Sequence, residues 1–314
     1  MDREQNALQM AIPTSRVKDA ATICIDEDKC ILCGKCIEVC KDYSIEVKDN
    51  RVVTTNNPVF GCIGCGHCMA VCPTGAIEIK GREISPADIY PLPDSSAACG
   101  YEQLSALLER RRSIREFSEK GVSADVIEKI LNAARTSPMG LPPSDVNVLV
   151  LGSREAVRGF GLDFCNYLNE MKWFVSRWFL GLMRPLWGKA NDEMFRGFVK
   201  PMFNFFIKES SRGVNMATHD APLAMYFYGS PYTDPADPII TATVAMYAAE
   251  SLGLGTCMIG SVHPLIQNGK KAKQFREKYK IKYTSREGLI VLFGYPAVKY
   301  KKGIRRTFAS EVHL

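Results

Sequence analysis

Eight of the twelve cysteines stand in two runs that share one spacing. The spacing is C-x2-C-x2-C-x3-C, and its positions are Cys30, Cys33, Cys36 and Cys40 in the first run and Cys62, Cys65, Cys68 and Cys72 in the second. Runs of this kind supply the thiolate ligands of paired 4Fe-4S clusters. Structural zinc sites also use pairs of cysteines two residues apart, but they have no use for the third step of each run. The spacing therefore favours two 4Fe-4S clusters over zinc.

Residues 20–81 resemble bacterial-type two-cluster ferredoxins, in which the fourth cysteine of each run reaches across to the other cluster. The resemblance implies that cluster one is held by Cys30, Cys33, Cys36 and Cys72. It implies that cluster two is held by Cys62, Cys65, Cys68 and Cys40. The first run is followed by Lys41 where the family has proline, whereas the second keeps Pro73. We therefore expect the two clusters to differ in reduction potential.

The front of the chain also contains an internal repeat. Apolar residues at 23–26 and 44–47 flank the first run, and similar residues at 58–60 and 76–79 flank the second. The pattern predicts strand, ligand loop, short helix and strand, twice. A unit this small usually needs metal or disulfides for stability, and the clusters would provide it.

The remaining cysteines, Cys24, Cys99, Cys165 and Cys257, have no partners at ligand spacing, and we assign them no role.

The first residues lack the basic and apolar regions of a secretion signal, so we expect a cytoplasmic protein. Residues 1–81 carry nine Lys/Arg and eleven Asp/Glu, a net charge of −2, so residues 82–314 carry +8 and the whole chain +6. No basic run is interleaved with aromatic residues, so we expect no nucleic-acid partner.

The length of 314 residues predicts more than one domain. We divide the chain into an N-terminal extension (1–19), a cluster domain (20–81), a proline-containing linker (82–100) and a second domain (101–314). In the second domain we expect a helix at 124–134, strands at 146–151, 224–228 and 289–293, and a long, alanine-rich buried helix at 239–252. The fold class is α+β.

Residues 166–211 contain all three tryptophans. Charged residues and Pro185 interrupt every apolar window, so we expect no transmembrane segment. Three readings stay open for this segment: a lid over a substrate pocket, an interfacial helix, and an insertion that packs on its own domain.

Four ordered motifs in the second domain resemble those of the FMN-dependent nitroreductase family. They are Arg111-Arg112-Ser113-Ile114-Arg115, the stretch 133–140, the glycine-containing stretch 251–260, and Phe293-Gly294-Tyr295-Pro296 followed by Arg305-Arg306. The whole chain thus resembles a ferredoxin–nitroreductase fusion. The resemblance implies a small ferredoxin-like domain followed by an α+β FMN domain with a central, mostly antiparallel sheet. It also implies a homodimer with the long helix in its interface.

The resemblance further implies which residues contact FMN. Arg111, Arg112, Ser113 and Arg115 would hold the phosphate and ribityl chain, with Arg305 and Arg306 closing on the phosphate. Ser137, Pro138, Met139 and Gly140 would lie along the isoalloxazine ring, and Ile259, Gly260 and Ser261 would face its N5 edge. Gly253 and Gly255 would help the backbone approach the ring, although a helix C-cap explains Gly253 equally well. Where many members read Asn-x-Gln-Pro-Trp, this chain reads Leu141-Pro142-Pro143-Ser144-Asp145.

These inferences predict an oxidoreductase that passes electrons from its 4Fe-4S clusters to FMN and on to an electron-poor nitro, quinone or enone compound. The alternative is an electron-transfer module that exchanges electrons with a redox protein or a membrane quinone. The donor is ferredoxin, NADH or NADPH. We identify no catalytic acid, because His219-Asp220 is explained at least as well by a helix-to-strand junction with an N-cap aspartate.

Overall fold

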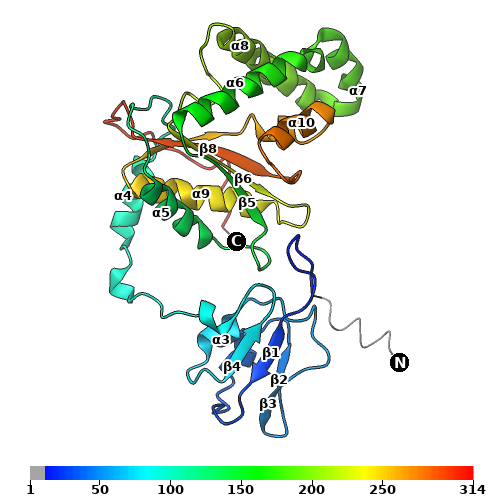
Figure 1. Ribbon diagram of the computed structural model, residues 1–314, viewed down its shortest axis with the longest axis vertical. Helices are drawn as coiled ribbons and strands as arrows, with labels where there is room; N and C mark the ends of the chain where they lie inside the picture. Colours follow the sequence, from blue (N-terminus) through cyan, green and yellow to red (C-terminus); the bar gives the residue numbers. More distant parts are fainter. Residues whose placement is uncertain (1–10, 314) are drawn as a thin grey trace.

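The computed structural model describes residues 11–313. A small domain contains both cysteine runs, and a large domain is built around a four-stranded sheet. Figure 1 shows the small domain, in blue and cyan, at one end of the molecule and the large domain at the other. A connector with two short 3-10 helices, Pro86–Asp88 and Ser95–Ala97, runs between them on one side. The dark blue N-terminal segment lies between the two domains (Figure 1).

The small domain has four strands and two short helices. They are β1 (Thr22–Ile25), α2 (Lys35–Val39), β2 (Ile45–Lys48), β3 (Arg51–Thr54), α3 (His67–Val71) and β4 (Ile77–Lys80). β1 pairs antiparallel with β4, and β2 pairs antiparallel with β3. Both helices follow a glycine, Gly34 or Gly66, with a φ of 74°, a conformation that costs glycine least. Each half therefore has the expected order of strand, helix and strand.

One predicted strand, at 58–60, is wrong. The strand that opens the second half is β3, which pairs directly with β2. The reason is the two-residue turn between them, because Asp49 and Asn50 have φ values of 51° and 57°. Asn and Asp tolerate this left-handed conformation, so the chain reverses at once and forms a hairpin.

The sheet of the large domain has the strand order β5-β6-β8-β7. Its strands are β5 (Val146–Leu151), β6 (Leu223–Gly229), β7 (Gly255–Ile259) and β8 (Gly288–Gly294), and every neighbouring pair is antiparallel. The predicted α+β class with an antiparallel sheet is confirmed. The sequence analysis missed β7, because its glycine-containing stretch was interpreted only as a flavin-facing loop.

Helices cover both faces of this sheet (Figure 1). One side carries α4 (Tyr101–Arg110), α5 (Ala124–Arg135) and α9 (Ala236–Ser251), and the other carries α6 (Arg154–Glu170), α7 (Arg177–Met194), α8 (Lys200–Ser210) and α10 (Lys270–Lys278). Strand residues alternate between the two cores. Met225 and Phe227 pack in the core with α5 and α9, whereas Tyr226 and Leu292 pack in the core with α6 and α10.

The aromatic segment forms α7, a π-helical stretch (Phe195–Val199) and α8. Its rings pack on one another, and the rings of Trp187 and Phe195 stack with centroids 4.5 Å apart. Val175 and Phe203 join the core under α6, so this segment is anchored on its own domain. Within residues 11–313, no helix is both long and apolar enough to cross a membrane.

Candidate functional site

The first predicted ligand set lines one pocket of the small domain. Cys30, Cys33 and Cys36 contribute from the first loop, and Cys72 contributes from the end of α3. Burial raises the pKa of Cys36, and the neighbouring thiols of Cys30 and Cys72 raise it further. The fold therefore brings together three cysteines of one run and the fourth of the other around a space. That arrangement fits a cluster with a thiolate at each corner.

The second predicted set forms a matching group. Burial raises the pKa of Cys68 to about 12, and the thiols of Cys62, Cys65 and Cys40 add to the effect. The pKa of Cys62 is raised in the same way, first by burial and then by Cys65 and Cys40. Cys40 thus reaches across from the first run, as the ferredoxin resemblance implies. Because iron binds thiolates, loading this set must displace protons.

The segment that carries the arginine motif lies beside β7. The Ile114 amide donates to the Thr256 carbonyl at 2.9 Å, and Ser113 bridges Thr256 in a parallel arrangement. Two buried polar atoms here, Arg111 Nη1 and Thr256 Oγ1, have no hydrogen-bond partner among the described residues. Buried donors are normally satisfied, so this pair fits an absent anionic acceptor such as the FMN phosphate. Thr256 is a candidate contact that the sequence analysis did not assign.

Of the other predicted phosphate-binding arginines, Arg112 lies in the same segment and is approached by the C-terminal tail. A Cβ added to Gly303 would come within 3.0 Å of Arg112 Nη2, so the C-terminal tail passes the arginine motif. Arg305 and Arg306 follow in the exposed part of that tail, and Arg115 is also exposed. Burial raises the pKa of Glu250, at the end of α9, while the nearby Arg111 lowers it.

The predicted ring-contacting residues 137–140 lie at the opposite end of α9. The Gly140 amide donates to the buried Asp237 carboxylate at 3.0 Å, in the first turn of α9, and burial raises the pKa of Asp237. Ser137 is buried and donates to the carbonyl of Ala134 at 2.7 Å. Pro138, Met139 and Gly140 are exposed. Since α9 rises about 1.5 Å per residue, the two groups are separated by roughly 20 Å along it.

Ile259 is the last residue of β7, and Gly260 and Ser261 follow it. A Cβ added to Gly260 would meet nothing within 4 Å, so the backbone faces open space there. The two preceding glycines serve packing and capping instead. Gly253 ends α9 with a φ of 81°, and Leu254 donates to the carbonyl of Ala249 as in a Schellman cap. A Cβ on Gly255 would approach Ile114 Cγ1 to 2.4 Å, which explains this glycine without a flavin.

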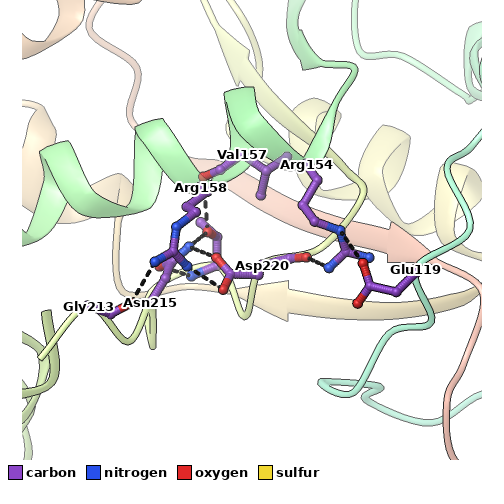
Figure 2. Close-up of polar contacts among 8 residues, drawn as sticks. Glu119, Arg154, Val157, Arg158, Gly213, Asn215 and Asp220 are labelled. Carbon is purple, nitrogen blue, oxygen red and sulfur yellow. Dashed lines mark hydrogen bonds and ion pairs between the residues drawn. The ribbon is translucent and has the colours of Figure 1, made fainter.

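Figure 2 shows that Asp220 belongs to a structural network. Its carboxylate accepts from Arg158 Nη1 at 2.6 Å and from Asn215 Nδ2 at 2.9 Å. Its carbonyl accepts from Arg154, which also approaches Glu119 (Figure 2). Asp220 therefore ties α6 to the segment before β6. It caps no helix, so that part of the sequence interpretation is wrong, while the junction itself is present. Burial lowers the pKa of His219.

Two family models match the chain. The nitroreductase family matches residues 108–295, and the 4Fe-4S dicluster domain matches residues 23–79. A search of curated proteins found no match.

A comparison with solved structures matched the large domain to nitroreductases. A nitroreductase with bound FMN from Bacteroides fragilis NCTC 9343 is 14% identical, with a TM-score of 0.50, and the match covers 68% of this chain and 98% of that one. A nitroreductase with bound FMN from Desulfitobacterium hafniense DCB-2 is 19% identical, with a TM-score of 0.48, and the match covers 69% and 99%. The first likeness shows that the large domain shares this fold.

Proposed function

Because the chain belongs to the nitroreductase family and also carries a 4Fe-4S dicluster domain, we propose that it is an FMN-dependent oxidoreductase supplied with electrons through its own clusters. One observation carries the proposal. A single chain combines a pocket lined by four cysteines with a buried arginine donor, Arg111 Nη1, that has no acceptor among residues 11–313. The first feature fits a cluster and the second fits a phosphate.

The chain's own residues would bind and orient the two kinds of cofactor. Arg111, Ser113 and Thr256 would hold the FMN phosphate, with Arg112 and the tail arginines beside them. The open space at Gly260 would admit the edge of the ring. FMN, when bound, accepts single electrons and delivers them in pairs to organic substrates. The cysteine sets would fix the clusters within the small domain.

We propose a homodimer, since nitroreductases are typically homodimers. The separation of residues 137–140 from the arginine motif supports it, because two chains could bring the groups together where one keeps them at opposite ends of α9. Apolar side chains left uncovered on α4 and the tail support it as well. Leu104 and Leu108 of α4 are each 42% exposed, and Phe308 of the tail is 81% exposed.

The substrate we propose is a small, electron-poor nitro, quinone or enone compound, with ferredoxin, NADH or NADPH as the donor. No nucleic acid and no membrane-spanning segment enter this proposal. The cytoplasmic location stays a prediction from the sequence.

The test is a comparison of turnover rates. Purified protein loaded with clusters and FMN is reduced with NADH, NADPH or reduced ferredoxin, and oxidation is followed with each class of acceptor. Faster reoxidation by at least one nitro, quinone or enone compound supports the enzyme. If only a redox protein reoxidises the protein, the chain is an electron-transfer module. Absence of extractable FMN would contradict both.

A further inference from the structure

Arg82 is a buried arginine at the junction of the two domains. Its side chain lies just after β4, and the residue is only 4% exposed. The guanidinium donates four hydrogen bonds, all to backbone carbonyls. The acceptors are Ile63 (2.9 Å), Asp19 (2.9 Å), Ile12 (3.1 Å) and Pro142 (2.9 Å). These four carbonyls belong to the second ligand loop, to two points of the N-terminal segment, and to the large domain.

The N-terminal segment, residues 11–19, is held between the domains by further contacts. The backbone amide of Ser15 donates to the Asp145 carboxylate at 2.8 Å, and its hydroxyl donates to the other carboxylate oxygen at 2.5 Å. Arg16 donates to the Ser144 carbonyl at 2.9 Å and pairs with Glu83 on the small domain. Pro142, Ser144 and Asp145 stand where the sequence departs from the common nitroreductase motif. The departing segment is thus the one that meets the cluster domain.

The backbone at Arg82 is unusual in a way that supports a special role. Arg82 and Glu83 have φ values of 51° and 59°, and the Ile84 amide donates to the Gly81 carbonyl at 3.1 Å. A two-residue turn with positive φ at both positions normally uses Asn-Gly, because other side chains are strained there. Such strain persists only where surrounding contacts fix the residue. Here the hydrogen bonds of the Arg82 side chain and the ion pair of Glu83 with Arg16 fix the turn.

Arg82 also packs against the second ligand loop. A Cβ on Gly64, between Cys62 and Cys65, would come within 3.1 Å of Arg82 Cβ. Burial lowers the pKa of Arg82, and the nearby Cys62 thiol opposes this effect. Within residues 11–313, no carboxylate lies within ion-pair distance of Arg82, and the direct partners of its guanidinium are carbonyl oxygens. The Asp19 carboxylate acts on it only from farther away. An unpaired positive charge near a cluster favours the reduced, more negative form of that cluster.

We propose that Arg82 is a positioning residue that holds the second ligand loop against the large domain and raises the reduction potential of cluster two. This inference rests on the proposed function, because it assigns cluster two as the one presented to the flavin domain. Lys41, from which the sequence predicts unequal clusters, is exposed and donates to the Glu38 carbonyl at 2.7 Å. Arg82 is a stronger source of that inequality, since burial reduces the screening of its charge.

Four variants of the full, cofactor-loaded chain separate the two effects. Arg82→Gln removes the charge and part of the fork of donors, whereas Arg82→Lys keeps the charge but loses the planar fork. Ser15→Ala loosens the N-terminal segment from Asp145 without touching the cluster domain. The double variant Arg82→Asn with Glu83→Gly places favourable residues in the turn while deleting the interdomain contacts. Arg51→Gln, an exposed arginine of the same domain, is the control.

Hydrogen exchange measures the positioning effect without any need for activity. The amides of residues 11–19 other than Pro13, and of Leu141, Ser144 and Asp145, should exchange faster in Arg82→Gln, Arg82→Lys, Ser15→Ala and the double variant, but not in Arg51→Gln. The double variant tests whether Arg82 serves only the turn. If it did, the double variant would show wild-type exchange at these amides, because Asn-Gly suits the turn by itself. Unchanged exchange in the Arg82 variants would overturn the positioning role.

Redox titration followed by electron paramagnetic resonance measures the charge effect. Arg82→Gln should lower the midpoint potential of one cluster and leave the other unchanged, while Arg82→Lys should lower it less and Ser15→Ala should not change it. Reduction of bound flavin by the clusters should slow by about tenfold or more in Arg82→Gln, since small misplacements of reacting groups are costly. Equal potentials in Arg82→Gln and wild type would overturn the electrostatic role. A wild-type protein without FMN would contradict the proposed function, while the exchange experiment would still test Arg82.

Discussion

At the scale of residues, chemistry depends on which side chains the fold isolates from water. The thiols of Cys62 and Cys68 have raised pKa values because they are partly buried near one another. The pKa of Cys72 is lowered overall, since hydrogen bonds from Thr74 and Ala76 outweigh the opposing effect of burial. Cys72 therefore ionises more readily than Cys36 of its own set and than Cys62 and Cys68 of the second set.

Cys65→Ala should remove cluster two and leave cluster one and FMN bound, because Cys65 belongs only to the second set. Iron and sulfide analysis should show about half of the wild-type content per chain, since one of the paired 4Fe-4S clusters is lost. Cys99→Ala is the matched control, as Cys99 is an exposed cysteine outside both sets. Wild-type iron content in Cys65→Ala would refute the assignment of ligands.

Arg111→Met should weaken FMN binding by about tenfold or more, because a charge-assisted hydrogen bond to the phosphate is lost. The flavin remaining after gel filtration and a fluorescence titration with FMN measure the effect. Arg212→Met, at an exposed arginine paired with Glu209, should bind FMN normally. If Arg111→Met retained as much flavin as that control, the orphaned guanidinium would need another explanation.

At the scale of elements, apolar periodicity located α5, α9 and three strands of the large domain. β6 and β8 are buried along their whole length. Their continuous apolar runs can therefore be recognised as strands without knowing which strands they pair with. β7 and β3 were missed because their character depends on pairing. β7 contains Gly255 and Thr256, and it becomes a strand through its ladder with β8.

A buried polar network beside β6 predicts a dependence of stability on pH. His263 is buried, its Nδ1 lies 2.8 Å from the Tyr226 hydroxyl, and burial lowers its pKa below 6.5. As the pH falls, His263 therefore takes up a proton more readily in the unfolded chain than in the folded chain. Stability should fall as the pH drops below about 6.5, by at most about 1.4 kcal/mol per pH unit for this one group.

His263→Gln should reduce this pH dependence between about pH 7 and pH 5. Urea unfolding followed by circular dichroism, in wild type and variant at each pH, measures the free energy of unfolding. The difference between the two proteins isolates His263, since loss of clusters in acid is common to both. Parallel pH profiles for both proteins would show that His263 does not control the effect.

At the scale of the whole molecule, apolar surface remains that one chain does not cover. Ile304 and Phe308 of the C-terminal tail are 75% and 81% exposed, and they lie beyond the point where the tail passes Arg112. Apolar side chains gathered on one surface often mark an interaction site. A second copy of the chain is the partner we propose.

Phe308→Asp should weaken the dimer by about tenfold or more, since burying an aromatic side chain contributes about 1.5–3 kcal/mol. Light scattering after size-exclusion chromatography over a range of concentrations measures the dissociation. Tyr43→Asp, at a residue that is 66% exposed on the small domain, should leave the dimer intact. A wild-type protein that is monomeric at all concentrations would contradict the proposed homodimer.

The sequence by itself determined the features that depend on local spacing. Two cysteine runs, the arginine motif and the long apolar strands can be read along the chain, because ligand geometry and burial impose their own periods. Tertiary structure alone decided which side chains have no partner and which meet across domains. The arginine motif meets Thr256 only because its Ser113 and Ile114 lie against β7. Arg82 lies in the predicted linker, and only folding surrounds it with carbonyls from residues 12, 19, 63 and 142. Hydrogen bonds between distant segments leave no period in a sequence, so the sequence could not predict them.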